Sequence, residues 1–350
     1  MEQAQILAVQ QKRKIPFGFM VGIGLTFVIA IVAKWLSALP FLNIMGQLVI
    51  AMLIGMVLRS FLVVPERIAV GTNFSSKKLL RFGIILLGMR LNLVDLVQAG
   101  PKVLLLAVVV ILFTIPVVYG LARFFKVEQK LGILTACGTA ICGAAAVVAI
   151  APQLKAKEEE TAIAAAVVAI LGTIFTLAYT LLYPVLGLSE LGYGVFSGAT
   201  LHEIAHVIAA AAPGGKAAVD LAVIEKLTRV ALLVPVAIVI GFVASRLERK
   251  QRGDQGKFEW RSIPIPWFIL GFLAVSGIHS IGIIPTAVAD FIVVIAYMLI
   301  AMAMAGLGLS VDFGSFRRFG IKSFCAGLIG SILLAGLVYG LMHLLHMASL

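Results

Sequence analysis

The sequence predicts an all-α polytopic membrane protein, and three observations support this fold class. Hydrophobic residues make up 61% of the 350 residues and charged residues only 13%, whereas a soluble domain has about 25% charged residues. Apolar runs of about 18 residues or more recur along the chain, and each can cross a hydrocarbon core of about 30 Å as a helix. The basic residues, which give a net charge of +12, lie mainly in short stretches between these runs.

Eleven apolar segments follow one another along the chain and predict about nine to eleven transmembrane helices. The first follows Lys12, Arg13 and Lys14. It is too long for a signal-peptide core and has no obvious cleavage site, so we expect an uncleaved helix. The longest polar stretch, 246–261, is expected to be a solvated loop, and nothing resembles a soluble domain. The segments are roughly 17–38, 42–63, 79–97, 101–122, 131–151, 161–187, 194–212, 218–245, 263–285, 286–309 and 320–347.

Two segments are rich in Gly, Ala, Ser and Thr and poor in Leu and Phe. They are ACGTAICGAAAVVAIAP (136–152) and FSGATLHEIAHVIAAAAP (196–213), and they resemble each other at an offset of about sixty residues. Small residues allow close backbone approach, and glycines permit a break in a helix. Each segment therefore predicts either a broken or re-entrant helix or, in the simpler alternative, a tightly packed spanning helix.

The distribution of Lys and Arg predicts a cytoplasmic N-terminus. If both small-residue segments re-enter, 22 of the 28 Lys and Arg residues fall at the N-terminus or in loops on that face, in agreement with the positive-inside rule. If both segments span instead, only Lys155 and Lys157 change side, so charge does not distinguish the two topologies. The cytoplasmic loops would be 59–81, 123–130, 152–160, 246–261 and 310–322.

A second pair of similar segments indicates an inverted repeat. RFGIILLGMRLNLVDLVQAGPK (81–102) resembles IAMAMAGLGLSVDFGSFRRFGIK (300–322), so that Gly88 matches Gly306 and Leu91 matches Leu309. In the topology above, the first segment runs outward and the second inward. Inverted repeats are typical of secondary transporters, which bind substrate near the membrane midplane on broken helices.

The chain resembles the sulfate exporter family, the YeiH-like bacterial inner-membrane proteins. The resemblance covers nearly the whole chain and is carried by LLRFGIILLGMRL (79–91), CGTAICGAAAVVAIAP (137–152), SGATLHEIAHVIAAA (197–211) and EKLTRVALLVPV (225–236). It implies a relation to the bile-acid symporter and cation–proton antiporter superfamily, inverted repeats, and a core that moves against a scaffold. In a single integral membrane transporter domain, 1–350, we expect core elements around 79–245 and 286–347 and scaffold helices around 17–63 and 263–285. The resemblance also implies a location in the inner (plasma) membrane.

The stretch TLHEIAHVIAAAAPGG contains His202-Glu203-x-x-His206, which on a helix is the signature of zinc proteases. Such a site needs both histidines on one helical face, a third ligand, and the Glu as the base for zinc-bound water. No recognisable third-ligand motif follows. Members of the family often have Gln at the position of His206, which disfavours a zinc site common to the family. An intramembrane metalloprotease is therefore kept only as an alternative.

Glu203 has a simpler interpretation as part of a capping box, in which Thr200 is the N-cap and Glu203 reaches back to the N-cap amide. This interpretation starts a helix directly after a break at Ser197 and Gly198. Thr139 is expected to cap the other small-residue helix in the same way. A helix that begins inside the membrane has free amides that attract an anion.

These patterns define a candidate anion site with no metal and no cofactor. Its histidines either line the anion path, titrating near neutral pH, or are packing residues. Its two cations either supply charge or, in the case of Arg229, form an i,i+4 ion pair with Glu225. The expected substrate-binding residues are Gly138, Thr139, Cys142, Gly143, Ser197, Gly198, Thr200, His202, Glu203, His206, Lys226 and Arg229.

We therefore expect a secondary transporter, in the direction of export, for a small inorganic or organic anion such as sulfate or sulfite, and not an enzyme. No nucleotide-binding G-x-x-x-x-G-K-[ST] motif occurs, so transport is expected to follow a gradient. Expected partners are the anion, the lipid bilayer, a proton or sodium ion as candidate coupling ion, and a second copy as a candidate homodimer. No basic-aromatic patch indicates nucleic acid. The alternatives are the metalloprotease and an anion channel.

Overall fold

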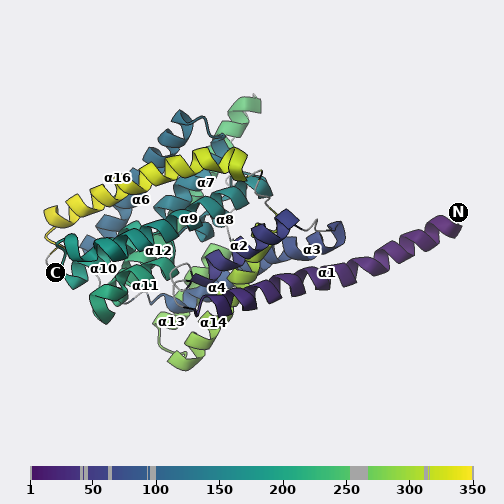
Figure 1. The fold of residues 1–350 in the computed structure, drawn as a ribbon, viewed down its shortest axis with the longest axis horizontal. Helices are drawn as coiled ribbons and strands as arrows, with labels where there is room; N and C mark the ends of the chain where they lie inside the picture. The colour runs from purple at the N-terminus through teal and green to yellow at the C-terminus, as the bar shows by residue number, and fades with distance from the viewer. Residues whose placement is uncertain are drawn as a thin grey trace.

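The computed structural model confirms the all-α membrane fold (Figure 1). It describes residues 2–39, 42, 46–61, 65–92, 94, 100–252, 267–310, 314 and 316–348. Within these ranges no strand is formed, and six helical spans are long and apolar enough to cross a membrane. The protein is therefore a multi-pass membrane protein.

Single helices make most of the passes. The longer ones are α1 (Glu2–Leu36), α6 (Pro101–Phe124), α9 (Glu158–Leu182), α12 (Gly215–Arg252), α14 (Thr286–Gly308) and α16 (Ile321–Leu344). Two are shorter: α2 (Gly46–Phe61) and α13 (Trp267–Ser280). The expected loop at 246–261 begins later than predicted, because α12 continues to Arg252; residues 253–266 lie outside the described part of the chain.

One pass is a composite of short helical pieces. It consists of α3 (Glu66–Phe74), a π-helical turn (Ser75–Leu79), α4 (Leu80–Leu87) and a 3-10 turn (Gly88–Arg90). The described residues thus form six long apolar spans, two shorter apolar helices and this composite segment. The two small-residue segments do not span.

The first small-residue segment is a re-entrant hairpin. It consists of α7 (Gln129–Ala140), a break at 141–143 and α8 (Ala144–Ile150). The Nζ of Lys130, at the start of α7, donates a hydrogen bond to the carbonyl oxygen of Lys155, just after α8, at 2.8 Å. The segment therefore leaves the bundle at the end where it entered.

The second small-residue segment is also a re-entrant hairpin, formed by α10 (Glu190–Thr200), a break at 201–203 and α11 (Ile204–Ala211). A Cβ added to Gly214 would lie 3.4 Å from the carbonyl oxygen of Glu190, so the two ends of this hairpin are also adjacent. The 25-residue helix α9 connects the two hairpins and is about 37 Å long. The hairpins consequently enter from opposite ends of the bundle, and the spanning alternative does not hold.

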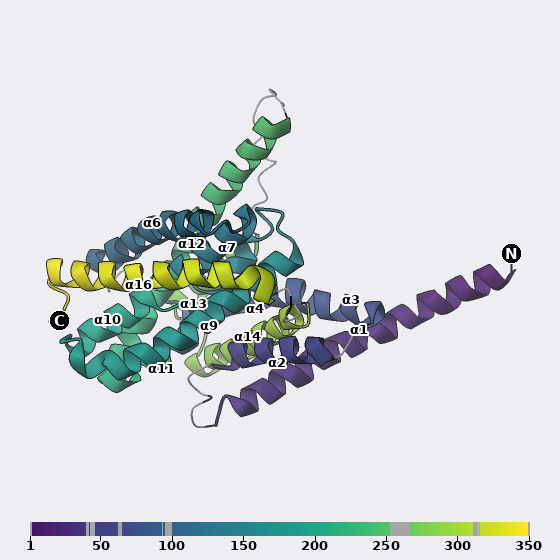
Figure 2. The ribbon, with the colours of Figure 1, turned by 45° about the horizontal axis from the view of Figure 1, so that its top comes forward.

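The helices pack as two bundles (Figure 2). The first bundle contains α1, α2, α3, α4, α13 and α14, and the second contains α6, α9, α12, α16 and both hairpins. The sequence-based division differs, because it grouped 79–97 and 286–309 with the hairpins. Glycines explain the observed packing: Gly308 of α14 contacts the carbonyl of Met52 in α2, and an added Cβ on Gly83 of α4 would lie 2.6 Å from the Ile300 side chain.

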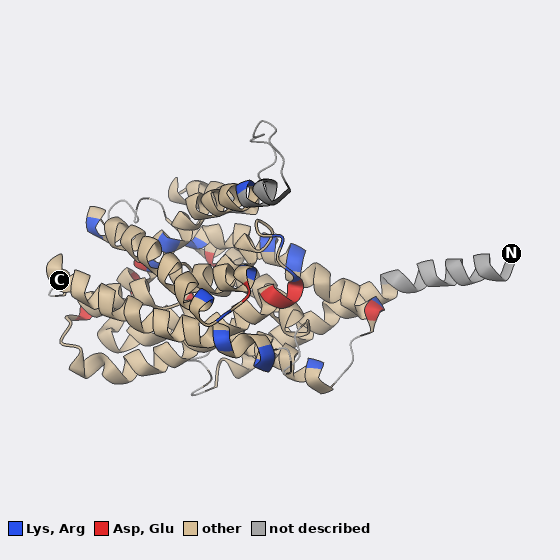
Figure 3. Cartoon of the chain, turned by 90° about the horizontal axis from the view of Figure 1, so that it is seen from above, with Lys and Arg blue, Asp and Glu red and all other residues tan. Residues whose placement is uncertain are grey.

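The segments of the second sequence repeat lie antiparallel, as an inverted pair requires. Gly83 of α4 faces Ile300 of α14, whereas Met89, farther along the first chain segment, packs against Val293 and Ala289, which come earlier in α14. The ribbon is richer in Lys and Arg toward the N-terminal end of the bundle than at the opposite end, near the C-terminus (Figure 3).

Candidate functional site

The tip of the first hairpin depends on Gly143. This residue is the N-cap of α8 and has φ +70°, a left-handed conformation that favours glycine. A Cβ added here would also lie 2.7 Å from Cγ of Glu203, at the tip of the second hairpin. Gly143 therefore permits both the chain reversal and the contact between the two tips.

The tip of the second hairpin differs from the predicted capping box. Helix α10 continues through Ser197 and Gly198 to Thr200, whose hydroxyl donates to the carbonyl oxygen of Phe196 at 2.7 Å. The break therefore falls at 201–203, and Glu203, not Thr200, is the N-cap residue of α11. The Glu203 carboxylate makes no capping hydrogen bond in its own helix; Oε1 instead accepts the backbone N–H of Ala144 in the other hairpin, at 3.5 Å.

The expected cap at Thr139 is also wrong. Thr139 lies inside α7, and Gly143 is the N-cap residue of α8. The Oγ1 of Thr139 and the Oγ of Ser197 are buried and have no hydrogen-bond partner among the described residues. Both hydroxyls therefore lie behind the tips rather than at the start of the helices that follow them.

Lys226 of α12 is fully buried and binds both tips. Its Nζ donates to the carbonyl oxygen of Ile141 in the first hairpin and to that of Leu201 in the second, each at 2.6 Å. These carbonyls follow the C-terminal ends of α7 and α10, where unpaired carbonyls carry partial negative charge. Lys226 thus neutralises both negative helix ends.

Arg229 lies one turn farther along α12, is also fully buried, and also binds both hairpin tips. Its described hydrogen bonds all go to backbone carbonyl oxygens at the two breaks, those of Thr139, Ala140, Gly198, Ala199 and Leu201. The i,i+4 ion pair with Glu225 does not form, since both carboxylate oxygens of Glu225 lack a hydrogen-bond partner among the described residues. Both cations are therefore at the predicted site, but they contact the protein backbone.

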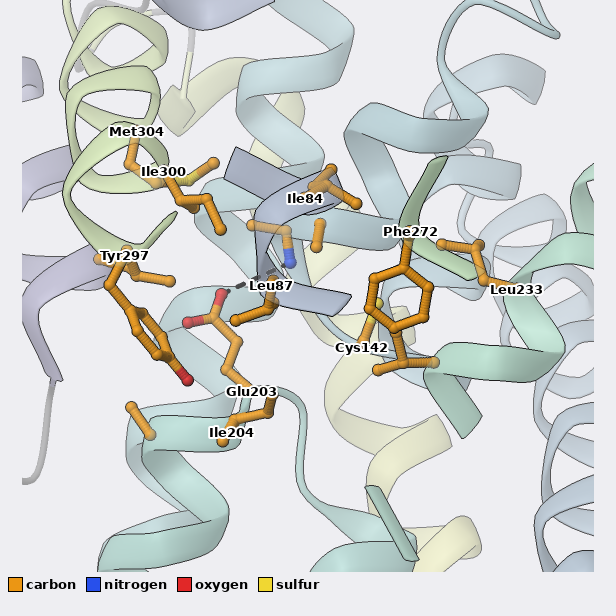
Figure 4. Close-up of a pocket in the computed structure, with 15 residues that line it drawn as sticks. Ile84, Leu87, Cys142, Glu203, Ile204, Leu233, Phe272, Tyr297, Ile300 and Met304 are labelled. Carbon is orange, nitrogen blue, oxygen red and sulfur yellow. Dashed lines mark hydrogen bonds between the residues drawn. The ribbon is translucent and has the colours of Figure 1, made fainter. Parts of the chain in front are cut away.

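A cavity of about 60 Å³ lies where the hairpin tips meet the first bundle (Figure 4). The first bundle contributes mainly apolar side chains, including Leu87, Phe272 and Tyr297. Among the described residues, Glu203 is the only carboxylate that lines this cavity, and the Glu203–Ala144 hydrogen bond lies at its wall (Figure 4). The hairpin residues at the cavity are Cys142, Ala144, Ala145, Glu203, Ile204 and Ala205.

A second cavity, of about 390 Å³, lies between the 3-10 turn that follows α4 and the first turns of α12. We call it the vestibule; its polar lining residues are Arg90, Asn92 and Asp220. The guanidinium of Arg90 lies 6.0 Å from the ring centroid of Tyr297, which lines the smaller cavity. Arg90 and Tyr297 thus stand between the vestibule and the hairpin tips. Sequence analysis did not assign either residue to the site. Arg90 lies in the segment 81–102, which was interpreted as one half of an inverted repeat, and Tyr297 lies in an ordinary apolar run.

The histidines do not line the cavity. Nε2 of His202 lies 3.4 Å from Oγ of Ser331 in α16, and Nε2 of His206 lies 3.3 Å from Oγ1 of Thr173 in α9. His202 is in the break and His206 is inside α11, so the two histidines do not share a helical face as a zinc protease requires. In the described part of the chain, no group of three or more His, Cys, Asp or Glu is placed to hold a metal ion.

Two of the remaining predicted residues, Gly138 and Gly198, allow close packing of each hairpin against its neighbouring helix. An added Cβ on Gly138 would lie 2.8 Å from the side chains of Val147 and Val168, and Gly198 contacts the carbonyl of Ala222. Of the predicted site residues, Cys142 and Glu203 line the cavity.

Comparisons with known proteins agree with a membrane protein of this kind. The family model described as Conserved hypothetical protein 698 matches residues 21–327. A UPF0324 membrane protein of Bacillus cereus is 71% identical over 341 residues, which is 97% of this chain and 95% of the relative. One from Listeria monocytogenes serotype 4b is 57% identical over 95% of this chain and 97% of the relative. One from Staphylococcus aureus is 37% identical over 94% and 97%.

No solved structure matches the chain. The family match covers both hairpins, α12 and most of both bundles, and the relatives align over nearly their whole length. The chain therefore belongs to the family described as Conserved hypothetical protein 698, the UPF0324 membrane proteins.

Proposed function

We propose that this membrane protein is a secondary transporter that carries a small anion by alternating access, with the hairpin tips as the substrate site. The observation that carries the proposal is the asymmetry of charge at the tips. Lys226 and Arg229 occupy the negative ends of α7 and α10. The start of α11 faces the cavity instead, beside the Ala144 amide, whose hydrogen bond goes to Glu203. Free amides at a helix start favour an anion.

The cavity favours a small substrate. Its volume of about 60 Å³ is well below the range of about 300–1,000 Å³ that is typical of sites for drug-sized ligands. An inorganic anion fits better than a larger organic one. Sulfate and sulfite are the first candidates, because of the resemblance to the YeiH-like exporters.

Access to the site supports alternating access rather than an open channel. The vestibule approaches the cavity from the end where α12 begins. At the other end, Lys77, in the π-helical turn of the first bundle, forms an ion pair with Glu158 at the start of α9 in the second bundle. The two ends thus differ: a cavity lies at the vestibule end, whereas an ion pair links the two bundles at the other. By the positive-inside rule, the end with the ion pair, which is rich in Lys and Arg, faces the cytoplasm.

Counterflow in proteoliposomes tests the proposal. Vesicles are loaded with sulfate, sulfite, nitrate or chloride, and uptake of the same labelled anion is measured. A carrier gives saturable uptake that the internal anion stimulates, whereas a channel shows no trans-stimulation.

Two leucine variants place the activity in the cavity. Ala145→Leu should lower uptake at least tenfold, because it fills the cavity, whereas Ala287→Leu, an exposed residue of α14, should not. Equal uptake by the two variants, or no stimulated uptake of any anion by the unaltered protein, contradicts the proposal.

A further inference from the structure

Glu203 occupies the place where the proposed function puts the substrate. Only 6% of Glu203 is exposed, and its side chain lines the cavity between the two bundles. One carboxylate oxygen accepts the Ala144 N–H, while the other, Oε2, has no hydrogen-bond partner among the described residues. The Glu203 carboxylate is therefore an anion supplied by the protein itself, and it accepts the Ala144 N–H that a transported anion would need.

The charges buried at the tips constrain what can bind. Lys226 and Arg229 contribute two positive charges, and Glu203 and Glu225 two negative charges when ionised; all four side chains are buried. This group is formally neutral. A monovalent anion entering the cavity would leave it with an excess negative charge, and an uncompensated charge in a low-dielectric interior is costly. One proton taken up with the anion restores neutrality.

Glu203 is the carboxyl placed to exchange that proton. Glu225 is fully buried behind the second hairpin, where its Cβ lies 2.9 Å from the position of an added Cβ on Gly198, and it does not line the cavity. Glu203, by contrast, lines the cavity, so a proton that enters the cavity reaches its carboxylate without crossing the hairpins.

The other titratable groups around Glu203 have separate contacts. Lys226 of α12 binds two carbonyls, and Tyr297 of α14 lies beneath Arg90. His202 and His206 face α16 and α9, and Cys142 is the neighbour from the first hairpin. From α2, α4 and α13 only apolar side chains line the cavity, those of Leu48, Ile84, Leu87 and Phe272.

We infer that Glu203 is the proton carrier of an anion–proton symporter. When ionised, it occupies the Ala144 amide and excludes the substrate. When Oε2 takes up a proton, the neutral carboxyl releases the amide, and one negative charge of the substrate replaces its own. The inference rests on the proposed function and names the coupling ion of that same site.

Nitrate is the probe for the test, because it carries a single charge over the whole range from pH 5 to 9. Nitrate affinity of the purified protein is measured by calorimetry, and nitrate uptake is measured in vesicles that contain a pH-sensitive dye. For the unaltered protein, the dissociation constant should rise about tenfold per pH unit on the alkaline side of the carboxyl titration, as linkage to one proton requires. Nitrate uptake should acidify the vesicle lumen.

Variants assign the proton to one residue. The nitrate dissociation constant of Glu203→Gln should change less than twofold between pH 5 and 9. This variant should still exchange nitrate, but without acidifying the vesicle lumen. Glu225→Gln and His206→Gln should retain the tenfold dependence. Glu203→Asp, which keeps a carboxyl, should retain coupling and provides the check if Glu203→Gln does not fold.

The outcomes separate the two proposals. Nitrate counterflow without lumen acidification in the unaltered protein, or full pH dependence in Glu203→Gln, overturns the proton-carrier role and leaves the transporter proposal standing. Loss of pH dependence in His206→Gln instead of Glu203→Gln also overturns it. If no anion shows counterflow, the proposed function fails and the coupling fails with it.

Discussion

Arg229 donates a hydrogen bond from Nε to the carbonyl oxygen of Ala140 over 3.0 Å, joining the middle of α12 to the tip of the first hairpin. Its Nη1 also donates to Ala199 in the second hairpin, at 2.7 Å. A single guanidinium thus binds the ends of two helices, the same two ends to which Lys226 also donates. A planar group with five donors suits this position better than an ammonium does.

Arg229→Gln should destabilise the protein strongly. Removing the guanidinium leaves carbonyls at both breaks without a donor, and each buried acceptor left unsatisfied costs about 1–3 kcal/mol. The melting temperature in detergent should fall by more than 5 °C. Arg229→Lys should be intermediate, since it keeps the charge but not the number of donors. Arg246→Gln, at an exposed position of the same helix, is the control, and an equal melting temperature for Arg229→Gln and this control contradicts the structural role.

Gly143→Ala should impair both folding and transport. Its φ of +70° costs a non-glycine residue about 1–2 kcal/mol, and the added Cβ would meet Glu203. We expect a lower melting temperature and at least tenfold slower anion counterflow. Gly277→Ala provides the comparison, because an added Cβ on this helical glycine meets nothing within 4 Å. Counterflow at the unaltered rate in Gly143→Ala would contradict the role of Gly143 at the hairpin tips.

Arg90→Gln should slow the entry of anions. The side chain lines the vestibule and lies over Tyr297, so its charge raises the local anion concentration ahead of the tips. We expect a severalfold lower initial uptake rate at low ionic strength and a smaller difference at high salt. Lys102→Gln, which removes an exposed cation at the start of α6, tests whether any charge at this end suffices. The same loss in both variants would argue against a specific role for Arg90.

Single cysteines at Lys155 and Gly215 should react from opposite faces of the membrane, with residue 155 on the cytoplasmic side. The two hairpins enter from opposite ends, and each of these residues lies just beyond one of them. Impermeant thiol reagents, applied to intact cells and to inverted vesicles, provide the measurement. Labelling of both positions from one face would be incompatible with two re-entrant hairpins.

Hydrophobic run length made the passes predictable from the sequence, and small-residue composition identified both hairpins. The position of the second break was misplaced by the local Thr200–Glu203 pattern, because the Glu203 carboxylate contacts Ala144, a residue of the other hairpin. A capping box describes only neighbours along the chain, and this contact is tertiary.

Residue type likewise identified Lys226 and Arg229, since charges inside apolar helices are seldom accidental. Their partners were not predictable, because those carbonyls come from hairpins distant in the sequence. The residues that the first bundle contributes to the cavity, such as Tyr297 and Phe272, occur in ordinary apolar helices. Only the packing of α13 and α14 distinguishes them from residues that face lipid.

The central claim, an anion site at the hairpin tips, can be tested at Cys142, which lines the cavity, unlike Cys137 and Cys325. In the variant Cys137→Ala/Cys325→Ala, the rate at which methyl methanethiosulfonate modifies Cys142 is measured with and without an anion that shows counterflow. A bound anion should occlude the thiol, and the modification rate should fall at least fivefold at saturating anion. A rate that stays the same at saturating anion would contradict the account, because it would place the transported anion away from the tips.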